Sequence, residues 1–213
     1  MFANKMKNIL LICVVLFVNN MNATNFSPRL HILRHNPPPP PEDYRRFGVI
    51  TQDQFTQKLD HFDPTNTMTW SQRYYTNNGF YDPSKRNIVF LMIGGESAAS
   101  SAWMNYGPWV ASARKYHALL FQLEHRFYGS SQPFSDLSLE NLRYLSSQQA
   151  LADLAYFIVS MNEKYQLSSD VKWILFGGSY SGSLAAWMRV KYPHLVHGVM
   201  SASGPLLAKL DFY

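Results

Sequence analysis

The chain has 213 residues, 46% of them hydrophobic and 15% charged, and its formal net charge is +5. This length predicts one globular domain or two small ones, and the composition excludes an intrinsically disordered protein. The basic residues are scattered along the chain rather than clustered in a stripe. Because phosphate binding needs such a stripe, we expect no nucleic-acid partner.

The first 23 residues predict a secretory signal peptide. Lys5 and Lys7 precede an uncharged apolar run at residues 9–18, and polar and small residues follow as far as Ala23. This order is typical of signal peptides, and cleavage is expected near Ala23. The apolar run is short for a bilayer span, which makes a retained membrane anchor the less favoured alternative. We therefore expect a secreted or lysosomal protein with no membrane association after cleavage.

Residues 24–47 predict an extended stalk or propeptide that leads to the folded domain. Five consecutive prolines at residues 37–41 favour polyproline II. An SH3-type ligand is the alternative, which a secreted location disfavours. Asn25, Phe26 and Ser27 form an acceptor triplet for N-glycosylation at Asn25. The only cysteine, Cys13, lies in the predicted signal peptide, so the mature chain would be free of cysteine, which is unusual for a secreted protein.

From residue 55 onward the sequence predicts strands and helices in alternation. Strands are predicted at residues 55–62, 69–76, 87–93, 117–123, 171–176 and 195–200, and helices at residues 103–116, from Ser146 onward and at 184–192. Ser146 with Gln149 three residues later is typical of a capping box. The β-α-β-α-β order predicts an α/β fold with a mostly parallel sheet and helices on both faces.

Ser179 is the most informative residue of the chain. It stands where an apolar predicted strand breaks through Gly177 and Gly178 into the next helix. A serine in such a turn is typical of the nucleophile elbow of α/β-hydrolases, in which glycine neighbours fit around a cramped backbone. Ser181 replaces the second glycine of the usual motif and is small enough to be tolerated, and Gly182 follows it. An ordinary glycine-rich loop is the alternative.

Five segments carry a resemblance to a known family. They are residues 55–62 (FTQKLDHF), 94–96 (GGE), 124–131 (EHRFYGSS), 149–153 (QALAD) and 177–187 (GGSYSGSLAAW). Together, and in this order, they resemble the prolylcarboxypeptidase and dipeptidyl-peptidase II family of serine peptidases over residues 55–213. The sequence Gly-Gly-Ser-Tyr-Ser-Gly is most similar to the thymus-specific serine protease branch of that family.

The resemblance implies a fold, an activity and a partner. Residues 48–213 would be the N-terminal part of an α/β-hydrolase peptidase domain, with a helical insertion that caps the site and selects proline before the scissile bond. The activity would be that of a secreted or lysosomal serine exopeptidase, of carboxypeptidase or dipeptidyl-peptidase type. The partner would be a peptide substrate, with no metal and no cofactor, and a homodimer of the full-length product is a further expectation.

The residues near Ser179 predict acyl transfer. The Ser179 hydroxyl would attack a carbonyl carbon, and the backbone N–H of Tyr180 would stabilise the oxyanion together with an N–H from the loop after the third predicted strand. That loop contains Gly95 and Glu96, and a plain strand-to-helix turn is its alternative interpretation. The side chains of Glu96, Trp103 and Tyr180 are candidates for a substrate-facing wall or for packing.

A serine nucleophile needs a histidine base and a carboxylate that orients the base. Downstream of Ser179 the chain offers His194, His197 and Asp211. The two histidines come too soon after the elbow helix to return to the catalytic edge, so none of these residues is assigned to the triad. His125, upstream, is expected to be a hydrogen-bonded histidine in the loop after the fourth strand.

The resemblance implies that the catalytic Asp and His lie beyond Tyr213. We therefore expect an N-terminal half of a peptidase that is inactive alone and whose last strand, at residues 195–200, leaves an open apolar edge. A non-catalytic secreted fragment or binding protein is the first alternative. An esterase or lipase on the same fold is the second, because an elbow specifies acyl transfer and not the acyl group.

Overall fold

The computed structural model describes residues 50–82, 84 and 87–208. The chain divides into two units, of which residues 37–205 form one and residues 1–36 with 206–213 form the other. All helices and strands named below belong to the first of these units. The signal peptide, the proline-rich stalk and the acceptor triplet at Asn25 lie outside the described residues, so they stay predictions.

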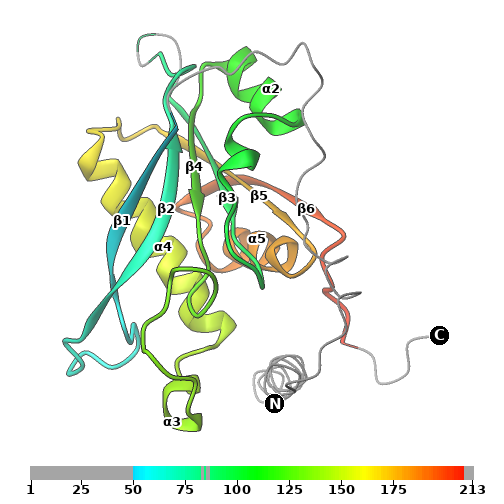
Figure 1. Cartoon of the computed structure of the whole chain (residues 1–213). Helices are drawn as coiled ribbons and strands as arrows, with labels where there is room; N and C mark the ends of the chain where they lie inside the picture. Colours follow the sequence, from blue (N-terminus) through cyan, green and yellow to red (C-terminus); the bar gives the residue numbers. More distant parts are fainter. Residues whose placement is uncertain (1–49, 83, 85–86, 209–213) are drawn as a thin grey trace. The chain divides into compact units, whose positions relative to one another are not determined.

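A six-stranded mixed sheet forms the centre of this unit (Figure 1). Its strands are β1 (Ile50–Lys58), β2 (Thr69–Asn77), β3 (Ile88–Ile93), β4 (Leu119–Leu123), β5 (Lys172–Gly178) and β6 (Val196–Ala202). They lie in the order β1-β2-β4-β3-β5-β6. The pairs β1–β2 and β2–β4 are antiparallel, and β4–β3, β3–β5 and β5–β6 are parallel. The predicted α/β fold is confirmed, with an antiparallel hairpin added at one edge.

The burial of the strands follows from their sequences. β3 reads Ile-Val-Phe-Leu-Met-Ile and β4 reads Leu-Leu-Phe-Gln-Leu, and every residue of β4 is buried. Continuous apolar runs are typical of strands that are covered on both faces. β1 is an edge strand with mostly exposed, polar residues, and polar side chains on an edge oppose pairing with other chains.

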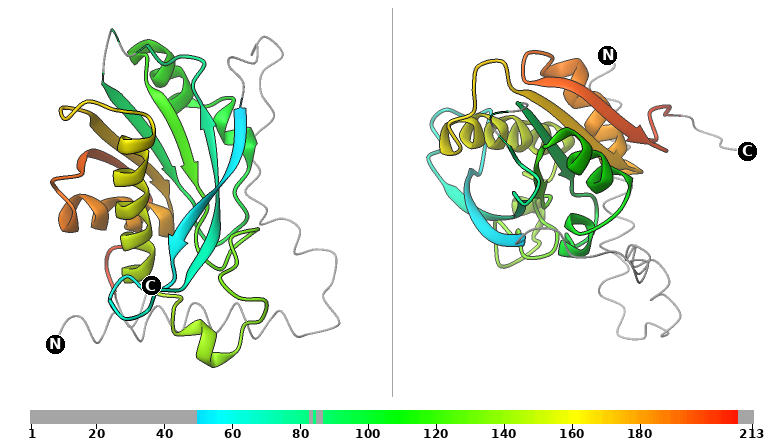
Figure 2. Two further views of the ribbon diagram at one scale, coloured as in Figure 1. Left: turned by 90° about the vertical axis from the view of Figure 1, so that its left-hand side faces the viewer. Right: turned by 90° about the horizontal axis from the view of Figure 1, so that it is seen from above.

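Helices cover both faces of the sheet, as predicted (Figure 2). They are the 3-10 helix η2 (Ser101–Met104) and the α-helices α2 (Pro108–Tyr116), α3 (Leu139–Leu142), α4 (Ser147–Lys164) and α5 (Tyr180–Lys191). α4 and α5 pack on one face, and η2 and α2 pack on the other. On the first face the ring of Phe121 lies 5.6 Å from that of Phe157 and 5.7 Å from that of Trp173. Aromatic contacts therefore join α4 to the central strands.

Two predicted helices differ from the observed ones. The helix predicted at residues 103–116 is divided into η2 and α2, because Gly107 has a φ of 107° and Pro108 begins a new helix. The helix predicted at 184–192 begins earlier, at Tyr180, directly after Ser179. The glycine and serine residues of its first turn disguise the start of this helix in the sequence.

The predicted capping box of α4 is only half present. The Ser146 hydroxyl accepts a hydrogen bond from the Gln149 N–H at 3.2 Å, as an N-cap residue should. The Gln149 side chain does not return to Ser146. It donates to Asp60 Oδ1 at 2.6 Å and accepts from the His61 N–H at 3.0 Å. Gln149 thus ties α4 to the β1–β2 connection instead of capping its own helix.

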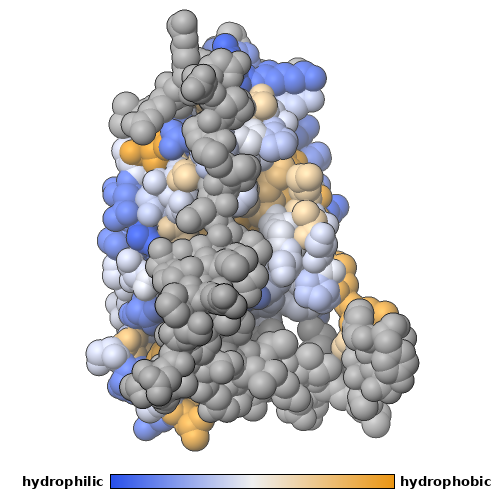
Figure 3. Space-filling model, turned by 45° about the vertical axis from the view of Figure 1, so that its right-hand side comes forward, coloured by the Kyte–Doolittle hydropathy of each residue, from blue (hydrophilic) through white to orange (hydrophobic). Residues whose placement is uncertain are grey.

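β6 forms the other edge of the sheet within the described residues. It pairs with β5, Val196 at its start is buried, and Met200 is 56% exposed. On the face that Figure 3 draws, the described apolar residues stand in small groups among hydrophilic ones. An open apolar edge was expected here, whereas the exposed residues of β6 are of mixed character: His197, Met200, Ser201 and Ala202.

Candidate active site

Ser179 occupies a strained turn between β5 and α5. Its backbone has φ 56° and ψ −129°, a conformation that residues with a side chain seldom adopt. The Ser179 N–H donates to the Ala202 carbonyl at 2.9 Å, which fixes the turn to the end of β6. The residue itself is exposed. This is the geometry of a nucleophile elbow, in which the turn holds the serine hydroxyl at the carboxyl edge of the sheet.

Two of the three glycines around the turn are required by packing. A Cβ on Gly177 would lie 2.1 Å from the Ser181 carbonyl oxygen, and one on Gly182 would lie 2.9 Å from the Ala202 carbonyl oxygen. A Cβ on Gly178 would meet nothing closer than 4.0 Å. Gly177 and Gly182 therefore permit the close approach of α5 to the strands, and Gly178 does not contribute to it.

Ser181 does more than fit the place of the second glycine. Its hydroxyl donates to the Gly178 carbonyl at 2.8 Å and accepts from the Gly178 N–H at 3.1 Å. The side chain therefore links the first turn of α5 to the end of β5 and braces the strained residue between them.

The loop after β3 lies beside the elbow. Met92 pairs with Phe176, so the chain leaves β3 and β5 at neighbouring points of the same edge. A Cβ on Gly95 would lie 3.7 Å from Ser181 Oγ, whereas one on Gly94 would lie 2.7 Å from the Leu123 carbonyl oxygen. Gly94 is thus required by packing against β4, and Gly95 stands next to the elbow.

The Tyr180 side chain is half-buried and packs against His125. Its ring lies 5.5 Å from that of His125, and its hydroxyl lies 3.2 Å from His125 Nε2. Burial raises the pKa of the Tyr180 hydroxyl, which therefore stays protonated. Tyr180 and Trp103 are both half-buried, and Glu96 is exposed, so all three remain candidates for contact with a substrate. As the first residue of α5, Tyr180 has a backbone N–H without an intrahelical partner, which suits an anion.

His125 is a buried and hydrogen-bonded histidine, as expected. Its Nδ1 lies 2.7 Å from the Arg126 carbonyl, which can only accept, so Nδ1 carries the proton. Desolvation by burial lowers the pKa of His125 to about 4. The ring is therefore neutral near pH 7, and its bare Nε2 accepts the hydrogen bond that Tyr180 donates.

We expect the protein to lose stability in mild acid because of His125. The unfolded chain takes up the proton near pH 6.5, whereas the folded protein does so near its pKa of about 4. Between these values the unfolded state binds more protons, so the free energy of unfolding falls as the pH falls. The shift corresponds to a loss on the order of 3 kcal/mol across this window.

Urea unfolding at about pH 7 and about pH 4.5 measures this loss. His125→Gln removes the titrating group and is expected to flatten the dependence, and His197→Gln, at an exposed position, is the matched control. Equal losses in the wild type and in His125→Gln would contradict the prediction.

His194 and His197 lie away from Ser179. α5 has 12 residues, so its ends are about 18 Å apart. Ser179 precedes α5, His194 follows it, and His197 lies on β6 opposite the first residues of β5. This separation agrees with leaving both histidines out of the triad, and Asp211 lies outside the described residues. Within residues 50–208 as described, no group of three or more acidic, histidine or cysteine residues is placed to hold a metal.

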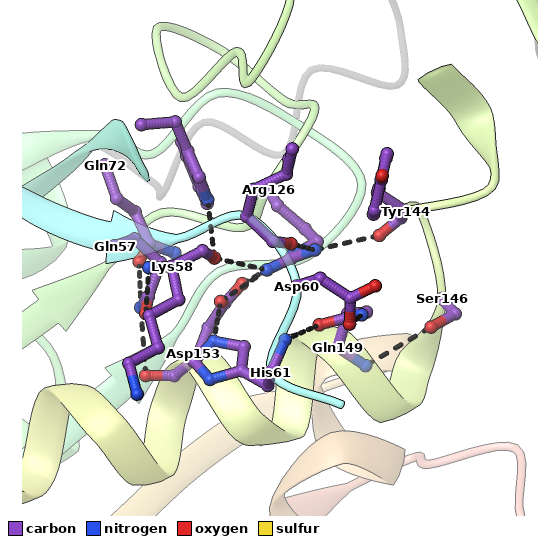
Figure 4. A network of polar contacts seen from close by, with 12 residues as sticks. Gln57, Lys58, Asp60, His61, Gln72, Arg126, Tyr144, Ser146, Gln149 and Asp153 are labelled. Atoms are coloured by element: carbon purple, nitrogen blue, oxygen red, sulfur yellow. Dashed lines mark hydrogen bonds and ion pairs between the residues drawn. The ribbon is translucent and has the colours of Figure 1, made fainter. Parts of the chain in front are cut away.

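The sequence analysis missed a buried polar network around Arg126 and Asp153 (Figure 4). The guanidinium of Arg126 binds Asp153 of α4 through Nε and Nη2, both at 2.6 Å. Its Nη1 donates to the carbonyls of Leu59 and Tyr144 at 3.1 and 2.9 Å, and His61 Nε2 lies 2.8 Å from Asp153 Oδ1. Three segments of the family resemblance, 55–62, 124–131 and 149–153, meet here, and their joint presence in the sequence was the available signal.

A serine in a strained turn after a central parallel strand, on a sheet covered on both faces, defines an α/β-hydrolase core. A peroxisomal alpha-beta-hydrolase of Saccharomyces cerevisiae shares this fold, with a TM-score of 0.54 at 10% identity over 79% of this chain and 46% of the other. The chain belongs to the serine carboxypeptidase S28 family, whose sequence profile matches residues 57–213.

Two curated relatives confirm the predicted family. The thymus-specific serine protease of Mus musculus is 44% identical over 165 residues, which are 78% of this chain and 32% of the relative. The lysosomal Pro-X carboxypeptidase of Mus musculus is 36% identical over 192 residues, which are 86% of this chain and 38% of the relative. The chain spans about a third of the length of the curated relatives that it matches.

Proposed function

We propose that the protein is a serine-type exopeptidase that forms an acyl-enzyme on Ser179. The observation that carries the proposal is the backbone of Ser179, an exposed residue held at φ 56° between β5 and α5. Such strain persists where the surrounding structure enforces it, and it is common at functional sites. Membership of a family of serine carboxypeptidases supports acyl transfer as the chemistry.

In the proposed reaction Ser179 Oγ attacks the peptide carbonyl carbon while its proton passes to a general base. The base then protonates the leaving amine as the C–N bond breaks, and water hydrolyses the remaining ester. No described residue is placed as the base, so we assign the base and its carboxylate partner to residues outside the described part of the chain.

The proposed oxyanion hole joins two segments. One donor is the Tyr180 N–H at the start of α5, and the other comes from Gly95 or Glu96 in the loop after β3. The neighbourhood of Gly95 and Ser181 supports this pairing. Loss of one such donor typically reduces kcat by about 100-fold to 1000-fold.

The proposed substrate is a peptide with proline before the scissile bond, cleaved in a secreted or lysosomal location. The relative named lysosomal Pro-X carboxypeptidase supports both parts of this proposal. No helix of the described part of the chain is long and apolar enough to cross a membrane. Peptides blocked at one end distinguish a carboxypeptidase from a dipeptidyl-peptidase. The first requires a free carboxyl terminus and the second a free amino terminus.

A fluorophosphonate probe tests the nucleophile directly. The protein expressed from its complete coding sequence is expected to be labelled, and Ser179→Ala is expected to be unlabelled. Ser71→Ala, which changes an exposed serine of β2, is the matched control and is expected to be labelled. Labelling of Ser179→Ala would contradict the assignment, and an unlabelled wild type would favour a non-catalytic binding protein.

Two further comparisons separate the remaining alternatives. Hydrolysis of a nitrophenyl ester without hydrolysis of a proline-containing peptide would favour an esterase. Labelling of the 213-residue chain by itself would show that a base lies within it, against the expectation that this chain is inactive alone.

A further inference from the structure

Glu124, directly after β4, is a buried carboxylate in contact with the loop after β3. Its side chain is 0% exposed and is paired with Arg73 of β2. Oε1 accepts a hydrogen bond from the Ala99 N–H at 2.8 Å. Oε2 accepts from the Ser130 N–H at 3.0 Å and from the Ser131 hydroxyl at 2.7 Å. Both oxygens of this buried charge are therefore used, which makes its position well defined.

Arg73 and Glu124 together hold both polar groups of Ala99. Arg73 Nη2 donates to the Ala99 carbonyl at 3.3 Å, and Glu124 accepts from the Ala99 N–H. At the other end of the loop, the Gly94 N–H donates to the Leu123 carbonyl at 2.9 Å. Residues 95–98, which include the proposed oxyanion donors, thus lie between two residues, Gly94 and Ala99, that are hydrogen-bonded to the end of β4.

The turn at Gly129 closes over the same carboxylate. Gly129 has a φ of 57°, and a Cβ there would lie 2.0 Å from Glu124 Oε1. The backbone of this turn therefore packs directly on the carboxylate. Glycine is required here both by the positive φ and by the closeness of the Glu124 carboxylate.

The next residue contacts the other half of the proposed oxyanion hole. His125 Nε2 accepts from the Tyr180 hydroxyl at 3.2 Å, and Nδ1 donates to the Arg126 carbonyl at 2.7 Å. Tyr180 carries the proposed N–H donor at the first position of α5. Its side chain therefore links that donor to the end of β4.

We propose that Glu124 and His125 are positioning residues of the oxyanion hole: Glu124 sets the Gly95 and Glu96 donors through Ala99, and His125 sets the Tyr180 donor through its hydroxyl. Two adjacent residues after a fully buried strand thereby fix the spacing of two segments that are distant in sequence. The inference rests on the proposed function, because it assigns a purpose to the donors of that site.

The first test is the hydrolysis of a proline-containing peptide by the protein from its complete coding sequence. Glu124→Gln replaces one of the two carboxylate oxygens by an NH2 group. The donors that bound the lost oxygen then face another donor and are repelled. We expect kcat to fall about 10-fold to 100-fold, with KM changed less than about 3-fold, because the displaced donors act in the transition state. Glu140→Gln, the same change at an exposed residue of α3, is expected to leave both constants unchanged.

The second test compares two replacements of His125. Asn can donate to the Arg126 carbonyl but does not reach Tyr180, whereas Gln is long enough to accept from the Tyr180 hydroxyl. We expect His125→Asn to lose about 10-fold in kcat and His125→Gln to recover most of it. Tyr180→Phe, which removes the donating hydroxyl, is expected to behave like His125→Asn.

The outcomes separate this inference from the proposed function. A wild type that does not hydrolyse the peptide would overturn the proposed function and this inference with it. An active wild type with an unchanged kcat in Glu124→Gln and His125→Asn, or with losses confined to KM, would overturn only the positioning role. Should Glu124→Gln fail to fold, equal kcat values in His125→Asn and His125→Gln would overturn it.

Discussion

Replacement of Arg126 by methionine is expected to lower the free energy of unfolding by about 3–5 kcal/mol. The side chains of Arg126 and Asp153 are 0% and 2% exposed, so the variant leaves a buried carboxylate without its main partner. It also leaves the carbonyls of Leu59 and Tyr144 without the donor that Arg126 supplies. Urea unfolding monitored by circular dichroism measures the change.

Matched variants separate the buried ion pair from a general effect of lost charge. Asp153→Asn removes the negative charge of the pair and is expected to destabilise the protein to a similar degree. Asp53→Asn removes one negative charge from the exposed strand β1 and is expected to change the free energy of unfolding little. Combining Arg126→Met with Asp153→Leu is expected to cost less than the sum of the single variants, because no unpaired charge then remains. Additive losses would show that the two residues do not act as a pair.

The sheet could be predicted from the sequence because its central strands have a local signal. β3 is a continuous apolar run and β4 is apolar except for Gln122, which is typical of strands that are covered on both faces. The helix boundaries were less predictable, since Gly107 and Pro108 divide a segment whose apolar pattern continues across them. The capping box failed for a tertiary reason: Asp60 and the His61 N–H, far away in sequence, compete for the Gln149 side chain.

The candidate site was predictable where it depends on the local backbone. The glycines around Ser179 indicate a cramped turn, and the structure has a positive φ at that residue. The contact between Tyr180 and His125 was not predictable, because the two residues lie 55 positions apart in the sequence. The same holds for Glu124, whose hydrogen-bond and ion-pair partners come from three separate segments of the chain. Such contacts depend on how the strands are ordered in the sheet, which no local pattern contains.

Replacement of Gly177 by alanine is expected to abolish the elbow. The added Cβ would lie 2.1 Å from the Ser181 carbonyl oxygen and 2.4 Å from its carbonyl carbon, both backbone atoms of the first turn of α5. α5 would have to move away from β5, which is expected to destabilise the fold by about 1–3 kcal/mol. Because a displacement of about 1 Å at a reacting group can reduce rates about 100-fold, labelling of Ser179 by a fluorophosphonate should slow by at least that factor.

Gly178→Ala is the matched control, because it makes the same chemical change one residue away. The nearest atom to its added Cβ, the Ala202 carbonyl oxygen, is 4.0 Å distant. This variant should therefore keep wild-type stability within about 0.5 kcal/mol and label at a similar rate. If both alanine variants label slowly, the elbow is sensitive to any side chain before Ser179, and the close approach of α5 at Gly177 is not the cause. If neither does, the strained turn is not what presents the serine, and the proposed role of the elbow fails.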